Sequence, residues 1–157
     1  MKNDQLQCSL KKLGTGIGVG IMAGLAGTIA ITVSQMIEVQ ITERKASTGP
    51  ADAVEKTLDI KPKPGTKKRL SQEVHWTYGT LWGTVRGILS ALGMNKWVAT
   101  GVHFGAITGT AMAMAPLEGQ KPVKEWSAKD VGIDLLHHAV YAIAAGLVFD
   151  AIYDSED

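Results

Sequence analysis

The residues from Leu13 to Ile37 form one continuous segment that contains no Asp, Glu, Lys or Arg. About 20 helical residues, rising about 1.5 Å each, cross the hydrocarbon layer of a membrane, and this segment is longer than that. A second segment, residues 97–117, also lacks these charged residues. In water, helices without a charged face must be buried on every side, which a chain this short cannot achieve twice. We therefore predict an integral membrane protein rather than a soluble four-helix bundle.

A cleaved signal peptide is the competing interpretation of the first segment, because Lys11 and Lys12 precede it. The segment is long for a signal peptide, it is rich in glycine, and it has no clear Ala-x-Ala cleavage site. We therefore expect it to remain in the protein as a membrane helix.

The composition excludes several other classes of protein. The 16 basic residues nearly balance the 15 acidic ones, so no overall basic field favours a nucleic-acid partner. The single cysteine, Cys8, excludes an intramolecular disulfide. No Cys/His spacing typical of zinc occurs, so we expect no metal site.

The remaining sequence predicts one all-α membrane domain over residues 1–157, a compact bundle of about four glycine-rich transmembrane helices. Ser71 is expected to cap the second helix, Gly93 to follow it and Pro116 to end the third. Ser127 and Asp130 resemble a capping box at the start of the fourth, whose uncharged centre is short for a crossing. The predicted helices cover about 13–42, 74–93, 97–115 and 128–153.

The segment 43–73 is predicted to be a polar, basic loop. It contains a short surface helix that Ser47 or Thr48 caps, with Pro50 in its first turn. Four crossings place this loop and the 116–128 connection on one side of the membrane. These loops hold most of the Lys and Arg residues, so the positive-inside rule puts them in the cytoplasm, although Lys11 and Lys12 argue against this orientation.

Glycines recur every four residues in three of the predicted helices and therefore line one face of each. In lipid, helices associate where small residues let their backbones approach closely. We expect these three glycine stripes to face one another within one monomer. The alternative is that one stripe faces outward and binds a second copy or another membrane subunit. The stripes consist of Gly16, Gly20 and Gly24, of Gly79, Gly83 and Gly87, and of Gly101, Gly105 and Gly109.

Polar side chains inside the predicted helices fall into two groups by depth. Charges within a bilayer usually mark a partner or a function, and the simplest expectation is that these residues pair with each other or reach the headgroups. The group near the loops contains Glu38, His75, Asp134, His137 and His138. The group near the termini contains Arg86, His103 and Asp150.

Neither group matches a catalytic motif: the chain has no GxSxG, HExxH, P-loop or dinucleotide fingerprint, so we expect no enzyme activity. We also expect no cofactor. One alternative is b-type haem, since His75 and His137 or His138 lie at matching depth on different helices, as axial ligands do.

The chain resembles the YagU-like family of uncharacterised bacterial inner-membrane proteins. The resemblance rests on Gly24-Leu25-Ala26-Gly27, on Glu38 through Arg44, on His75-Trp76 with Gly79 and Gly83, on His103-Phe104-Gly105 and on Ala115-Pro116-Leu117. It implies a polytopic protein of the inner membrane and supplies no established activity.

These patterns lead to one expected function and two alternatives. We expect a non-enzymatic membrane protein that serves as a structural or accessory subunit of a larger membrane complex. The first alternative is a small transporter, channel or proton-conducting protein that uses the intramembrane polar residues. The second alternative is a b-type haem protein.

Overall fold

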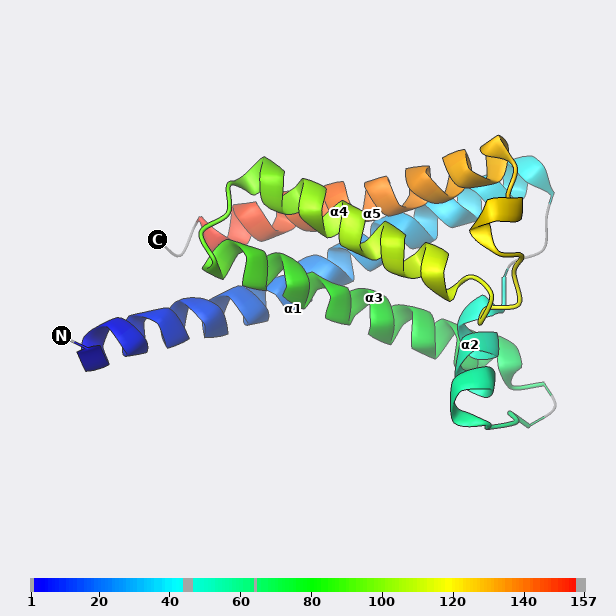
Figure 1. Cartoon of the computed structure of the whole chain (residues 1–157), viewed down its shortest axis with the longest axis horizontal. Coiled ribbons are helices and arrows are strands. Elements are labelled where there is room, and N and C mark those ends of the chain that lie inside the picture. The colour runs from blue at the N-terminus through cyan, green and yellow to red at the C-terminus, as the bar shows by residue number, and fades with distance from the viewer. Residues whose placement is uncertain (1, 44–46, 64, 155–157) are drawn as a thin grey trace.

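A computed structural model describes residues 2–43, 47–63 and 65–154, and within them the chain is helical with no strand. Four long helices run along the molecule, while the short helix α2 and the 3-10 turn η1 lie at one end (Figure 1). The elements are α1 (Lys2–Thr42), α2 (Gly49–Leu58), α3 (Lys67–Ala91), α4 (Lys96–Met114), η1 (Val123–Glu125) and α5 (Ala128–Tyr153).

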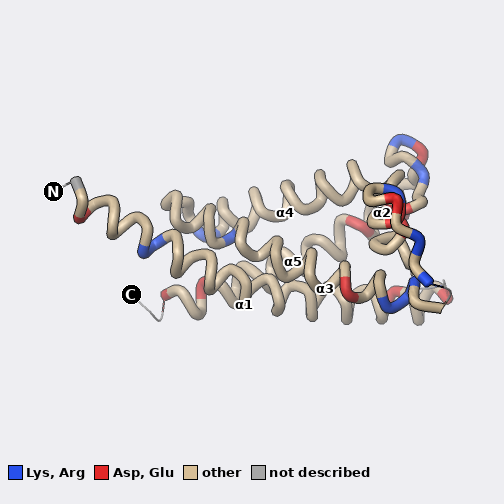
Figure 2. Tube along the Cα trace, turned by 90° about the horizontal axis from the view of Figure 1, so that it is seen from below, with Lys and Arg blue, Asp and Glu red and all other residues tan. Residues whose placement is uncertain are grey.

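The long helices alternate in direction, so the connections gather at two ends of the bundle. The start of α1, the turn from α3 to α4 and the end of α5 lie at one end, which we call the terminal end (Figure 1). Helix α2 and η1 lie at the opposite end, the loop end. Charged residues concentrate at the loop end and are sparse along the middle of the helices (Figure 2). This arrangement of the chain ends agrees with the predicted topology.

Most of the predicted helix limits follow from local capping. Ser127 and Asp130 form the predicted capping box of α5, in which the Ser127 hydroxyl accepts from the Asp130 N–H at 3.1 Å. Thr48 precedes α2, with Pro50 in its first turn as expected. The predicted Ser71 cap is wrong, because α3 already begins at Lys67 and Ser71 is buried within it. Of the two predicted caps of α2, Ser47 accepts a hydrogen bond from the Gly49 N–H on its hydroxyl oxygen at 3.0 Å. The Thr48 hydroxyl caps no backbone N–H and donates instead to the Asp52 carboxylate at 3.2 Å.

Helices α1 and α3 touch through their glycine stripes. A β-carbon added to Gly16 would lie 2.8 Å from the Gly87 carbonyl oxygen, and one added to Gly20 would lie 2.5 Å from that of Gly83. A β-carbon on Gly24 would lie 2.9 Å from the Gly83 Cα. These separations leave no room for a side chain, so the two backbones are in direct contact, as the sequence predicts for these two stripes.

The third glycine stripe does not join them, and the expectation that all three stripes meet is wrong. No atom lies within 4 Å of a β-carbon placed on Gly101, Gly105 or Gly109 of α4. Helix α4 packs on α5 through its other side, where Ala99, His103 and Ile107 are buried. The stripe on α4 therefore faces outward, which is the arrangement that the sequence left open as the alternative.

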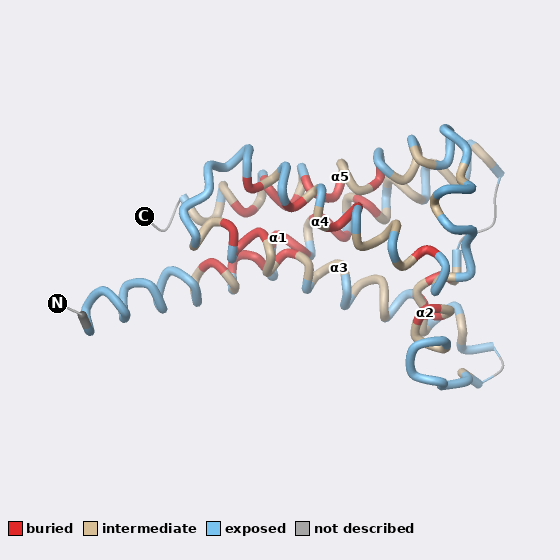
Figure 3. The backbone as a smooth tube through the Cα atoms, in the orientation of Figure 1, coloured by how far each residue is buried: buried red, intermediate tan, exposed pale blue. Residues whose placement is uncertain are grey.

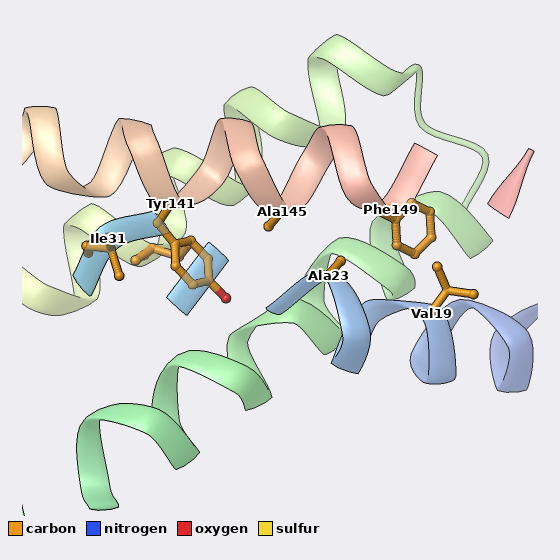
Figure 4. Close-up of a cluster of buried hydrophobic side chains, with 7 residues drawn as sticks. Val19, Ala23, Ile31, Tyr141, Ala145 and Phe149 are labelled. Carbon is orange, nitrogen blue, oxygen red and sulfur yellow. The ribbon is translucent and has the colours of Figure 1, made fainter. Parts of the chain in front are cut away.

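The core between α1 and α5 is built mostly from small or aromatic residues. Ala23 and Val19 of α1 lie opposite Ala145 and Phe149 of α5, and Tyr141 packs nearer the loop end (Figure 4). Large aliphatic side chains are mostly on the outside instead, whereas the buried residues follow the inner faces of the helices (Figure 3). The most buried large side chains include Arg86 and His103. This is the reverse of the usual distribution in a water-soluble protein.

Two helices, α1 and α5, are long and apolar enough to cross a membrane, whereas the sequence analysis expected four such helices. Helix α3 falls short because it contains Arg86, His75 and several threonines. Helix α4 falls short because its 19 residues include Lys96, His103 and several glycines and threonines. Helix α5, whose uncharged centre is short for a crossing, qualifies because a stretch of 18 of its 26 residues is apolar on average and contains no more than two charged residues.

Candidate functional site

The polar residues near the terminal end form one connected group around Arg86. The Arg86 guanidinium forms an ion pair with Asp150 Oδ1 of α5, as expected from their matching depth. Arg86 is 1% exposed, and its Cζ lies 4.5 Å from the centroid of the Phe149 ring. The aromatic face stabilises the cation on the side that Asp150 does not reach. Together these contacts join α3 to α5 through a buried charge.

A second ion pair lies beside the first but on the surface. Lys96, the first residue of α4, pairs with Asp154 at the end of α5, and each side chain is more than half exposed. This pair links α4 to α5 at the terminal end. Because both groups stay in contact with solvent, we expect the pair to contribute little to the free energy of unfolding.

His103 lies between the two ends of the bundle and is completely buried. Its Nε2 lies 3.0 Å from the Trp82 carbonyl oxygen, so Nε2 carries the proton and donates to that oxygen. Nδ1 is then an acceptor, and it has no hydrogen-bond partner among the described residues. The ring packs against Tyr141, whose hydroxyl donates to the Gly79 carbonyl. His103 therefore ties α4 to α3 in the middle of the bundle.

The polar residues near the loop end are brought together in part. His75 lies 3.1 Å from the Thr32 hydroxyl, and it is close enough to His138 for their charges to interact. His138 Nδ1 lies 3.3 Å from a carboxylate oxygen of Asp134, one turn earlier on the same helix. The predicted cluster is therefore present in part, since Asp134 and His138 are in contact on α5 whereas His75 is hydrogen-bonded to α1.

Two other residues predicted for this cluster have different surroundings. His137 Nδ1 lies 2.8 Å from the Ser34 hydroxyl and so joins α5 to α1. The Glu38 carboxylate accepts a hydrogen bond from Thr42 at 3.0 Å, within its own helix. His75 and His137 are each hydrogen-bonded to a hydroxyl of α1, whereas His138 Nδ1 lies 2.9 Å from the Asp134 carbonyl oxygen in its own helix.

The sequence analysis missed one member of the loop-end group, Glu118. This residue lies in the α4–α5 connection, which the sequence analysis placed on the loop side without assigning a role to any of its residues. Burial raises the pKa of the Glu118 carboxyl; the hydrogen bond from Gln120 opposes this rise, and the nearby charge of Asp134 adds to it. A β-carbon on Gly49 would lie 2.9 Å from Glu118 Oε2, so this carboxyl covers the start of α2. Its position directly after the Ala115-Pro116-Leu117 helix exit was the available signal.

Helix α2 is fixed to the bundle by lysines of the basic segment. Lys67 Nζ lies 2.6 Å from Asp52 and 3.3 Å from Glu55, both on α2. Lys56 of α2 donates to the Pro116 carbonyl oxygen at 2.9 Å. Part of the basic charge is therefore used to hold the loop end together, while Lys61, Lys63 and Lys68 are exposed.

No three His, Cys, Asp or Glu side chains in the described part of the chain are grouped as a metal site requires. The arrangement instead consists of hydrogen-bonded or ion-paired polar residues that connect one helix to the next. These contacts join α1, α3, α4 and α5 at the terminal end, in the middle of the bundle and at the loop end.

Comparison with known proteins adds no relative: no family model matches the chain, and no curated protein or solved structure is similar to it. The resemblance to the YagU-like family therefore stays a prediction from the sequence.

Proposed function

We propose that the chain is an integral protein of a bacterial inner membrane, with all four long helices within the bilayer and the 43–73 loop on the cytoplasmic side. One observation supports this proposal above all: the bundle has polar and small residues inside and large apolar residues outside. On α1, Met22, Ile29 and Val33 are half exposed or more, and Leu136 and Leu147 of α5 are equally exposed. In water such a surface is a strong aggregation liability, whereas lipid solvates it.

The packing supports including α3 and α4 in the membrane, although these helices are less apolar than α1 and α5. Helix α3 touches the α1 backbone from Gly16 to Gly24, so the two helices occupy the same depth. The charge that lowers the hydropathy of α3, Arg86, is buried against Asp150 and does not face the surroundings. A buried, paired charge does not need to be exposed to lipid.

Fractionation of cells that express the chain tests the membrane location. We expect the protein in the membrane pellet after ultracentrifugation, to resist extraction by alkaline carbonate, and to dissolve in mild detergent, because the apolar exterior requires an amphipathic solvent. A folded protein that stays in the supernatant without detergent would contradict the proposal.

We infer further that the protein acts as a structural or accessory subunit, which associates with another membrane helix through α4. The outward glycine stripe of α4 supports this function. Val98 and Val102, on the same face, are exposed, so a second helix can approach α4 along Gly101, Gly105 and Gly109. The α1–α3 contact demonstrates how such a stripe packs when a partner is present.

Native mass spectrometry of gently solubilised protein tests this association. We expect a complex with a second chain or a second copy, and we expect Gly105→Leu to abolish it, because a leucine side chain holds the partner backbone away. The matched control is Gly18→Leu, which also adds leucine at an open helical glycine but lies on α1. A lone monomer with no copurifying chain, or equal effects of the two substitutions, would count against an accessory subunit.

Conduction through the intramembrane polar residues and binding of b-type haem remain predictions from the sequence. No contact described above favours either of them over the structural role.

A further inference from the structure

A groove of about 220 Å³ lies between the first turns of α4 and the last turns of α5, at the terminal end of the bundle. It opens to the outside, since Trp97 is 73% exposed and Leu147 is 57% exposed. Lys96 and Asp150, which form the ion pairs described above, are part of its lining, whereas its apolar part has no role described above.

The lining of the groove is polar near the terminal end and apolar toward the middle of the bundle. Lys96 and Asp150 line the part nearest the terminal end. Leu147 and Ile143 lie one and two turns further along α5 toward the middle of the bundle, and they line the apolar part. Trp97 flanks the groove at the polar end, where the amphipathic indole ring favours a membrane interface. A molecule that fits this gradient has a polar head and an apolar chain.

The polar end presents a cation beside an anion. Among the described residues, the Lys96 side chain pairs with Asp154 at the surface. An exposed pair of this kind contributes about 0–1 kcal/mol, so a ligand phosphate can replace it. The first turn of α4, whose Trp97 N–H is capped by the Asn95 side chain, adds the positive end of the helix dipole. Arg86 engages Oδ1 of Asp150 from the interior, and the Asp150 side chain is 22% exposed toward the groove.

This combination of charges discriminates between lipid headgroups. A phosphate beside Lys96 and a primary ammonium beside Asp150 would both be paired, and the ammonium would donate hydrogen bonds to the carboxylate. A choline headgroup has no N–H to donate. A glycerol headgroup supplies the phosphate but leaves the Asp150 carboxylate without a cation from the ligand.

We propose that the α4–α5 groove binds a phospholipid with an ethanolamine headgroup, with its phosphate at Lys96, its ammonium at Asp150 and an acyl chain along Leu147 and Ile143. This proposal rests on the membrane location proposed above. The site binds one lipid molecule from the bilayer and requires no second protein chain.

Quenching of Trp97 fluorescence by lipids with brominated acyl chains tests the site. The protein is reconstituted in phosphatidylcholine vesicles that contain a minor fraction of brominated phosphatidylethanolamine, phosphatidylglycerol or phosphatidylcholine. The emission of the Trp97→Phe variant, which comes from the other tryptophans, is subtracted from that of the wild type to give the Trp97 component. We expect brominated phosphatidylethanolamine to quench the Trp97 component severalfold more than random mixing gives, and the other two lipids to quench it as random mixing gives.

Lys96→Gln should return the quenching by brominated phosphatidylethanolamine to the level of random mixing, because the loss of one charge-assisted hydrogen bond lowers the affinity about tenfold. Lys124→Gln, at an exposed lysine of η1 at the opposite end, should leave it unchanged. Equal quenching by the three lipids, preference for phosphatidylglycerol, or equal effects of the two substitutions would overturn the ethanolamine site. Protein that does not float with the vesicles would overturn the membrane location as well, whereas protein that floats without headgroup preference overturns the groove alone.

Discussion

Replacement of Gly20 by leucine should prevent the native packing of α1 on α3 and leave little folded protein. The new side chain would collide with the backbone of Gly83, whose carbonyl oxygen lies 2.5 Å from the position of the first added carbon. A backbone cannot change rotamer to make room, so the helices must separate along the whole glycine contact. We expect a loss of more than about 3 kcal/mol in the free energy of unfolding, measured by denaturant titration in detergent micelles.

Gly18→Leu is the matched control for this substitution. Gly18 lies two residues away on the same helix, and a β-carbon there meets no atom within 4 Å. Since leucine has a higher helix propensity than glycine, Gly18→Leu should unfold at the same denaturant concentration as the wild type or slightly above it. If the two variants were equally stable, α1 and α3 would not be in backbone contact.

Arg86→Met should be the most damaging substitution of a charged residue. It leaves the Asp150 carboxylate partly buried without its cation, and it removes the guanidinium from the Phe149 ring. Breaking a buried ion pair on one side costs about 3–5 kcal/mol, and we expect a value near the lower limit, because Asp150 retains some contact with the surroundings. The same denaturant titration measures this loss.

Two further variants separate the ion pair from a general loss of packing. The double variant Arg86→Met with Asp150→Leu should recover most of the stability, because it leaves no unpaired charge. Lys96→Met, which removes the exposed partner of Asp154, should cost less than about 1 kcal/mol. If Lys96→Met and Arg86→Met had the same effect, the Arg86–Asp150 pair would not be buried in the folded protein.

Local signals in the sequence were sufficient for much of the helical framework. The Ser127–Asp130 capping box begins α5 where the sequence places it, and Pro50 lies in the first turn of α2. The starts of α1 and α3 were placed too late in the chain, at about residues 13 and 74 instead of Lys2 and Lys67. The length of an apolar segment predicts which part of a helix can lie in lipid. The helix itself extends beyond that part through polar residues, so the apolar segment does not predict where the helix begins.

The candidate site was predictable where depth alone decides the contact. Matching depth was enough to predict that Arg86 lies near Asp150 and that His75 lies near His138, because the members of each pair are on neighbouring helices. The orientation of α4 was not predictable, since a glycine repeat marks a face suited to close packing but does not specify its partner. Glu118 was missed for a similar reason: its environment depends on how the α4–α5 connection folds over Gly49.

The α1–α3 glycine contact also limits how these helices can slide past each other. A movement of α1 by one residue would bring Ile17 and Ile21 against the α3 backbone at the positions of Gly16 and Gly20. The next position of α1 that again places glycines of the stripe against α3 is one four-residue repeat away, about 6 Å along the helix axis. Helix α1 therefore cannot slide along α3 in steps smaller than one glycine repeat.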